Sequence, residues 1–156
     1  MFEVPVDGWY AWLGTAAASL AVLAVAFGLP TAPPPDAAGA ADTVDRTAVA
    51  EYGASAEHPL DDATAVRITP RSIGMRNDAG RTHATFAYGP VTPVVDGPLR
   101  RVLEGAPPEA VFESPAALRH AAASARGRDA RWRPVDGPLI VRHVSLEGED
   151  VTLVGA

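Results

Sequence analysis

The residues with the clearest capacity for chemistry form an arginine cluster near the end of the chain. Arg126, Arg128, Arg131 and Arg133 occur close together, and Trp132 lies among them. Guanidinium groups bind carboxylates and phosphates in a bidentate geometry and also stack on aromatic rings. We therefore select these five residues as a candidate contact with lipid headgroups, an acidic partner or a nucleic acid. A structural alternative stays open, because arginine also favours the C-terminal end of a helix and Trp132 can begin a strand.

The remaining residue types give no catalytic or metal-binding pattern. The four histidines, His58, His83, His120 and His143, are scattered singly, without the paired spacing of a metal site. Cysteine is absent, which excludes disulfides and thiolate ligands. The sequence also lacks a nucleophile elbow, a Walker loop and a dinucleotide-binding glycine motif. We therefore predict a non-enzymatic protein with no catalytic residues, no metal site and no cofactor.

The composition narrows the classes of partner. All 13 basic residues are arginine, against 19 acidic residues, and the formal net charge is −6. An acidic chain is poorly suited to nonspecific nucleic-acid binding, which depends on neutralising phosphates. We therefore expect no nucleic-acid partner. The acidic, lysine-free composition, rich in alanine, glycine and proline, resembles that of proteins from salt-loving archaea.

A long uncharged stretch near the N-terminus dominates the rest of the chain. Residues 8–35 carry no ionisable acidic or basic side chain. About 20 helical residues cross a bilayer core, so we predict a transmembrane helix at 9–29 after a short tail at 1–8. Trp9 and Trp12 suit the headgroup layer at one end, and Pro30 stops the helix at the other. A cleaved signal peptide is the alternative, although no basic residue precedes the stretch.

One face of this predicted helix carries only small residues. These residues, at alternating spacings of three and four, are Gly14, Ala17, Ala21, Ala24 and Gly28. Small residues let a second helix approach closely, which is how helices associate within a membrane. Alternatively, a face of small residues arises by chance, because alanine, glycine and serine are abundant throughout the stretch. We interpret the face as a helix-packing surface and expect the lipid bilayer and other membrane or cell-surface proteins as partners.

The chain after this stretch reads as three segments. Residues 30–35 form a proline-rich spacer. Residues 36–58 form an amphipathic helix with a thin, alanine-rich apolar face, capped at its start by Asp36. Residues 59–156 form a small α+β domain. The fold class is therefore α+β, with an N-terminal transmembrane helix, a spacer, an amphipathic helix and then an antiparallel sheet with short helices.

Within the α+β domain, alternation and turn residues predict two hairpins and two helices. Residues 65–95 alternate as strands, and the Asn77–Gly80 segment has the composition of a hairpin loop. A second hairpin spans Leu139–Leu146 and Val151–Val154. Helices are predicted at 98–104 and 115–126, the latter capped by Ser114. We expect one antiparallel sheet with helices packed on one face.

This layout resembles that of type IV pilins and pseudopilins. The segments MFEVPVDGWYAWLG and GLPTAPPPDAAGAADTVD also look like a haloarchaeal family of membrane-anchored proteins without an established activity. That family is associated with gene neighbourhoods for pilus-like or tight-adherence-like secretion machinery. Pilins carry a basic residue before their cleavage point and a glutamate near the start of the mature helix. Here no basic residue precedes Trp9 and position 13 is leucine, so an unprocessed accessory subunit fits better than a polymerising one.

Three hypotheses for function follow. The first is a non-enzymatic, membrane-anchored accessory or structural protein of an archaeal cell-surface or pilus-like assembly, acting through protein–protein contacts. Its C-terminal domain would lie outside the cell membrane. The second is an extracytoplasmic domain that binds a small ligand or ion, which requires a pocket lined by convergent polar groups. The third is a membrane-tethered enzyme, which requires two or more of His83, His120, His143 and nearby carboxylates within hydrogen-bonding reach.

Overall fold

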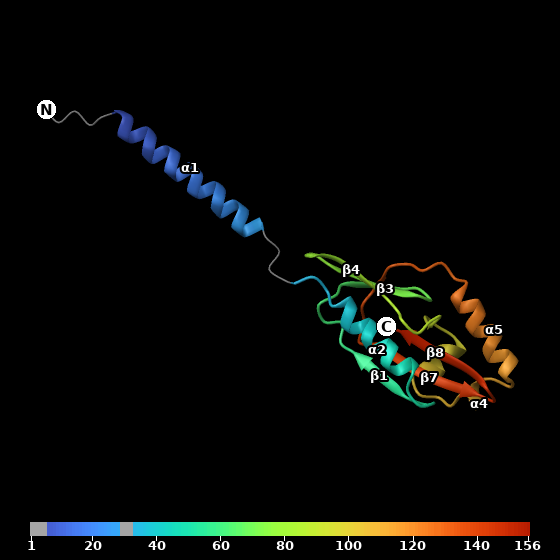
Figure 1. Cartoon of the computed structure of the whole chain (residues 1–156). Helices are drawn as coiled ribbons and strands as arrows, with labels where there is room; N and C mark the ends of the chain where they lie inside the picture. Colours follow the sequence, from blue (N-terminus) through green and yellow to red (C-terminus); the bar gives the residue numbers. More distant parts are fainter. Residues whose placement is uncertain (1–5, 29–32) are drawn as a thin grey trace. The chain divides into compact units, whose positions relative to one another are not determined.

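The computed structural model describes residues 6–28 and 33–156, which belong to two compact units. The first unit comprises residues 1–31 and the second residues 32–156. Within the first unit, the described residues form one helix, α1 (Val6–Gly28). The second unit contains two four-stranded sheets and the remaining helices (Figure 1). This architecture belongs to the α+β class, as predicted.

Helix α1 differs from the prediction in its membrane-spanning capacity. In the described part of the chain, no helix combines the length and the apolarity needed to cross a membrane. Many of its residues are alanine, glycine, serine or threonine, which contribute little to insertion into hydrocarbon. Leu29, the predicted end, lies outside the described residues. The predicted transmembrane helix at 9–29 is therefore contradicted.

Helix α2 (Ala37–Ala48) is shorter than the predicted amphipathic helix at 36–58. Asp36 caps it, because its Oδ1 accepts a hydrogen bond of 2.9 Å from the Gly39 N–H. The helix ends at Ala48 with Val49 as its C-cap, and Gly53 then adopts a positive φ of 87°. Residues 55–58 are not helical but form strand β1 (Ser55–His58). Pairing with a neighbouring strand therefore replaces the last helical turns.

The described part of the proline-rich segment is attached to the second unit. The Asn77 side-chain amide donates to the carbonyl of Pro33, and the Thr82 hydroxyl donates to that of Pro35. Pro35 is also buried. Residues 33–35 therefore belong to the second unit and are not a free spacer. Residues 29–32 lie outside the described part.

The first sheet has the strand order β1-β7-β8-β5. Strands β7 (Leu139–Leu146) and β8 (Glu149–Gly155) form the predicted second hairpin, although β8 begins two residues earlier than expected. Its turn uses Glu147 and Gly148, both at positive φ. Strand β5 (Thr92–Pro93) pairs with β8 in parallel, a pairing that the sequence did not predict.

The second sheet has the strand order β4-β3-β2-β6. It consists of β2 (Ala65–Ile68), β3 (Ser72–Asn77), β4 (Gly80–Thr85) and β6 (Arg133–Pro134). The hairpin between β3 and β4 was predicted. The Asn77 Oδ1 accepts hydrogen bonds from the N–H groups of Ala79 and Gly80, which closes the turn. The predicted single antiparallel sheet is therefore two sheets.

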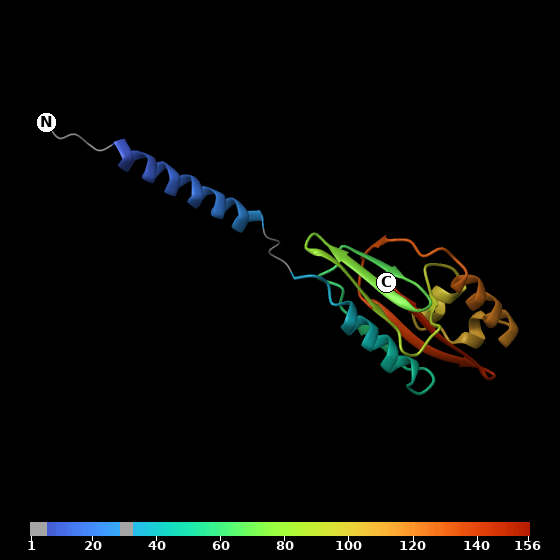
Figure 2. The ribbon, with the colours of Figure 1, turned by 45° about the horizontal axis from the view of Figure 1, so that its top comes forward.

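Three helices cover the first sheet on one side: α3 (Pro98–Leu103), α4 (Pro108–Val111) and α5 (Pro115–Arg126). The Ser114 side chain accepts from the Ala117 N–H and caps α5, which has the predicted bounds. The Arg142 guanidinium, on β7, donates to the carbonyls of Val102 and Ala106. These bonds attach the α3–α4 segment to the sheet. Figure 2 shows α5 at the opposite side of this sheet from α2.

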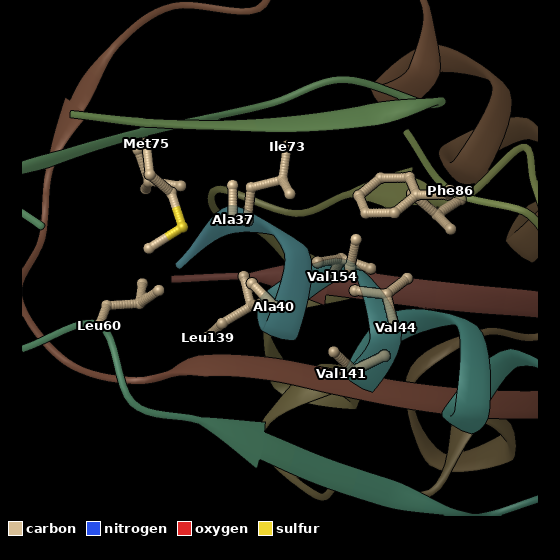
Figure 3. Packing of buried hydrophobic residues seen from close by; sticks show 13 residues of the cluster. Ala37, Ala40, Val44, Leu60, Ile73, Met75, Phe86, Leu139, Val141 and Val154 are labelled. Carbon is tan, nitrogen blue, oxygen red and sulfur yellow. The ribbon is translucent and has the colours of Figure 1, made fainter. Parts of the chain in front are cut away.

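Two apolar cores follow from this layering. One lies between the two sheets and α2, where Ile73 and Met75 of β3 face Val141 and Val154 of the first sheet (Figure 3). Alanines 37 and 40 bring α2 close to these side chains. The other core lies between the first sheet and the helices α3–α5, and includes Leu118. The first sheet is therefore apolar on both faces.

Candidate functional site

The arginine cluster predicted from the sequence divides between two surfaces. Arg131 and Arg133 line a pocket, whereas Trp132 lies between them in sequence and contacts other arginines on the second sheet. Successive side chains of an extended segment point to opposite sides, and β6 begins at Arg133. One short segment therefore supplies groups to two different sites.

The pocket has a cavity volume of about 570 Å³. It lies where β5 and β8 end and β7 begins, beside β2 and the segment between α5 and β7. Its apolar lining residues are Val66, Ile68, Pro93, Val94, Val95, Ala125, Ala130, Pro134, Pro138, Ile140 and Ala156, together with Gly137. Its charged lining residues are Arg100, Arg128, Arg131, Arg133, Asp129 and Asp136. We call it the arginine-lined pocket.

Two of the four lining arginines form ion pairs. The Arg100 Nε lies 2.7 Å from a Glu104 carboxylate oxygen, and its Nη1 donates to the Ala156 carbonyl at 3.2 Å. The Arg128 Nη1 lies 3.1 Å from a carboxylate oxygen of Asp96. Within residues 33–156, Arg131 and Arg133 form no ion pair with a carboxylate. These two exposed guanidinium groups therefore remain available to a ligand.

A second basic surface covers the outer face of the second sheet. The Arg76 and Arg67 guanidinium carbons lie 4.9 Å and 5.3 Å from the centroid of the Trp132 ring. Gly74 makes this packing close, since a Cβ there would lie 3.2 Å from the ring. Strand pairing places Arg81 opposite Arg76 and His83 opposite Gly74. We call Arg67, Arg76, Arg81, His83 and Trp132 the basic face.

Sequence reasoning missed the arginines of the basic face. A signal was present, because Arg67 and Arg76 each adjoin a buried residue, Val66 and Met75, in strands that alternate. That alternation assigns both arginines to the outer side of the sheet. Their contact with Trp132 has no local signal, since it joins segments far apart in the sequence.

Arg126 was also selected from the sequence, but it does not line the pocket. It occupies the last turn of α5 and is half-buried. Its Nε is buried without a hydrogen-bond partner in the described part of the chain. This position agrees with the alternative interpretation, in which Arg126 is a basic residue that stabilises the C-terminal end of a helix.

The histidines do not gather. His83 on β4 and His120 on α5 are exposed, and His58 lies 3.4 Å from the Thr43 hydroxyl. His143 donates from Nδ1 to the Ala50 carbonyl at 3.1 Å. Among the described residues, no group of three histidine, aspartate or glutamate side chains is arranged to hold a metal ion.

Tyr52 forms a contact that the sequence did not reveal. Its hydroxyl donates to a carboxylate oxygen of Asp150 at 3.1 Å, and its ring meets His143 edge-on at 5.2 Å. The hydrogen bond and the negative charge of Asp150 both favour the neutral phenol and raise the pKa of Tyr52. No local sequence pattern predicts a contact between residues so distant in the chain.

We expect Asp150→Asn to lower the pKa of Tyr52 toward its ordinary value. Because the pKa is raised in the folded protein, the stabilising effect of this bond is present below about pH 10 and is lost as pH rises through the folded pKa. An absorbance titration of phenolate formation measures the shift, and Tyr52→Phe identifies the signal. An identical titration in wild type and Asp150→Asn would contradict the contact.

The small-residue face of α1 is present as one side of a regular helix. Gly14, Ala17, Ala21 and Ala24 are all exposed within their unit, and no atom of the described residues would lie within 4 Å of a Cβ added at Gly14. Gly28 is the last residue of the helix. Large apolar side chains of α1 are also exposed, including Trp12 at 78% and Val22 at 70%. The first unit therefore presents apolar surface on several sides.

Comparison with known proteins identifies a matching family. The sequence profile of DUF7283, described as a family of unknown function, matches residues 3–144. The matched region includes α1, the basic face, the four arginines of the arginine-lined pocket and most of the second unit. No curated protein and no solved structure matches the chain. Since the match covers far more than half of the 156 residues, the chain belongs to the DUF7283 family of unknown function.

Proposed function

We propose that this protein is a non-enzymatic accessory or structural component of an archaeal cell-surface, pilus-like assembly and that it acts through protein–protein contacts. The basic face is the observation that carries the proposal. Arg67, Arg76 and Arg81 make no ion pair with a carboxylate in the described part of an acidic chain. A local basic surface on an acidic protein attracts and orients an acidic partner surface.

The arrangement of Trp132 favours a protein partner over a nucleic acid. Single-stranded nucleic acids bind by stacking their bases on free aromatic rings. Two guanidinium groups already lie over the Trp132 ring, so the ring is not a free stacking platform. Its role is to hold Arg67 and Arg76 in place, which lowers the entropy cost of binding carboxylates.

Helix α1 supports the same proposal independently. Exposed apolar surface of this extent, including Trp9, Trp12 and Leu20, marks a site of association. We assign the contact to a helix of another protein in the assembly. The face formed by Gly14, Ala17, Ala21, Ala24 and Gly28 allows that helix to approach closely.

Charge reversal tests the role of the basic face. We expect Arg67→Glu combined with Arg76→Glu to reduce partner recovery at least tenfold after cross-linking in intact cells. Arg101→Glu is a single-site control for charge reversal, since Arg101 is an exposed arginine outside the arginine-lined pocket and the basic face. Equal recovery of the same cell-surface proteins with all variants would overturn the proposal. Recovery of the wild type with lipid alone, without any second protein, would also overturn it.

A second candidate function is the binding of a small ligand. The observation that favours it is the volume of the arginine-lined pocket, about 570 Å³, which falls within the usual range of ligand sites. Its lining combines apolar side chains with six charged residues, and polar groups of this kind orient ligands in binding sites. Direct titration of the full-length protein with small anions tests this candidate.

A further inference from the structure

We propose that the arginine-lined pocket binds an amphipathic monocarboxylate, a molecule with one carboxylate and an extended apolar body. This inference rests on the second candidate function and specifies the chemical class of the ligand. It is independent of the contact proposed for the basic face.

The apolar part of the lining comes from strands β2, β5, β6 and β7, from the end of α5 and from the segments that adjoin them. Ile68 on β2 and Ile140 on β7 are half-buried, and Val94 follows β5. A half-buried apolar side chain that faces a cavity gains free energy when a ligand excludes water from it. The lining therefore favours a ligand with an apolar body over a small inorganic ion.

The charged part of the lining selects a carboxylate. Arg100 and Arg128 are already paired with Glu104 and Asp96, whereas Arg131 and Arg133 are exposed and form no ion pair in the region 33–156. A guanidinium group binds a carboxylate through two parallel hydrogen bonds. The two available guanidinium groups can therefore hold the acidic end of a ligand at the pocket edge.

The same edge disfavours ligands with several negative charges. Asp129 and Asp136 also line the pocket, and both carboxylates would repel a polyanion. Arg131 and Arg133 have no carboxylate partner among the described residues, and two aspartates lie beside them. This arrangement suits a ligand with a single negative charge. Together with the apolar lining, this charge balance specifies a monocarboxylate with a long apolar body.

Calorimetric titration of the full-length protein at pH 7.5 tests this inference with defined probes: hexanoate, octanoate, decanoate, decanol and inorganic phosphate. We expect the affinity to rise about threefold to fourfold for each added methylene group that the pocket buries. Decanoate should bind at least tenfold more tightly than decanol or phosphate. The inference would be overturned if decanol bound as tightly as decanoate. It would also be overturned if hexanoate, octanoate and decanoate bound with the same affinity.

Two variants locate the binding. Arg131→Gln combined with Arg133→Gln should weaken decanoate binding at least tenfold, whereas the control Arg101→Gln should leave it unchanged. Ala130→Phe should occupy part of the pocket and reduce binding similarly, with thermal unfolding confirming that each variant is folded. Binding to the exposed apolar side chains of α1 would survive all of these changes, and unchanged affinity would therefore overturn the inference.

The probes also separate this inference from the functions proposed above. If phosphate or decanol binds better than decanoate and the pocket variants abolish that binding, the small-ligand function stands and the monocarboxylate class is wrong. If no probe binds, both the class and the small-ligand function are wrong. Neither result changes partner recovery through the basic face, which the charge-reversal experiment measures separately.

Discussion

Replacing Leu118 by alanine is expected to lower the free energy of unfolding of the second unit by about 2 to 5 kcal/mol. Leu118 is fully buried on α5 and belongs to the core beneath the first sheet. Its removal leaves a cavity that the surrounding side chains fill only in part. The same helix carries Ala125, which lines the arginine-lined pocket. Loss of this anchor should therefore weaken ligand binding as well as stability.

Denaturant unfolding of the full-length protein measures this effect. Leu20→Ala is the matched control, because it removes the same atoms from a side chain that is 66% exposed on α1. We expect the control to change the unfolding of the second unit by less than about 0.5 kcal/mol. A loss below about 1 kcal/mol for Leu118→Ala would show that α5 does not depend on this core contact.

Elements with signals in neighbouring residues were predicted well from the sequence. Helix α5 has the predicted bounds because Ser114 caps its start and Gly127 follows its end. The β3–β4 hairpin was predicted from the composition of residues 77–80, and the Asn77 side chain closes that turn as expected. In both cases the physical cause lies within a few residues of the element.

Pairings between segments that lie far apart in the sequence were not predicted. Strands β5 and β6 contain two residues each, too few to show alternation, and their partners β8 and β2 lie more than 50 positions away. Whether the two predicted hairpins pair with each other also depends on distant contacts, and the single predicted sheet is in fact two. The segment Ser55–His58 was assigned to a helix because its preference for β7 is likewise a tertiary effect.

The N-terminal helix shows a different limit. The predicted membrane span rests on the uncharged run at 8–35, its length and the aromatic and proline residues at its ends. These features do not measure how apolar the helix is. Insertion depends on large aliphatic side chains, and much of α1 is alanine, glycine, serine or threonine. The length of the uncharged run therefore did not predict whether α1 is apolar enough to cross a membrane.

The candidate site was found in part. The density of arginines at positions 126–133 identified Arg128, Arg131 and Arg133, which all line the pocket. It could not assign Trp132 to the other surface, because that depends on pairing between β2 and β6. The contact of Arg67 and Arg76 with Trp132 likewise requires the folded sheet.

The alanine-rich face of α2 leads to the second prediction. Ala40 is fully buried and lies close to Leu139 and Val141 of the first sheet (Figure 3). We expect Ala40→Leu to lower the free energy of unfolding by about 1 to 3 kcal/mol, because the added atoms have no space between the helix and the strands. Denaturant unfolding measures the loss.

Ala38→Leu is a matched control within the same helix. Ala38 is exposed, so this change adds the same atoms on the solvent side with the same change in helix propensity. We expect it to alter stability by less than about 0.5 kcal/mol. Equal stability of the two variants would mean that α2 does not pack closely on the first sheet. A large difference would show that the small residue at position 40 allows the close approach of α2 to the first sheet.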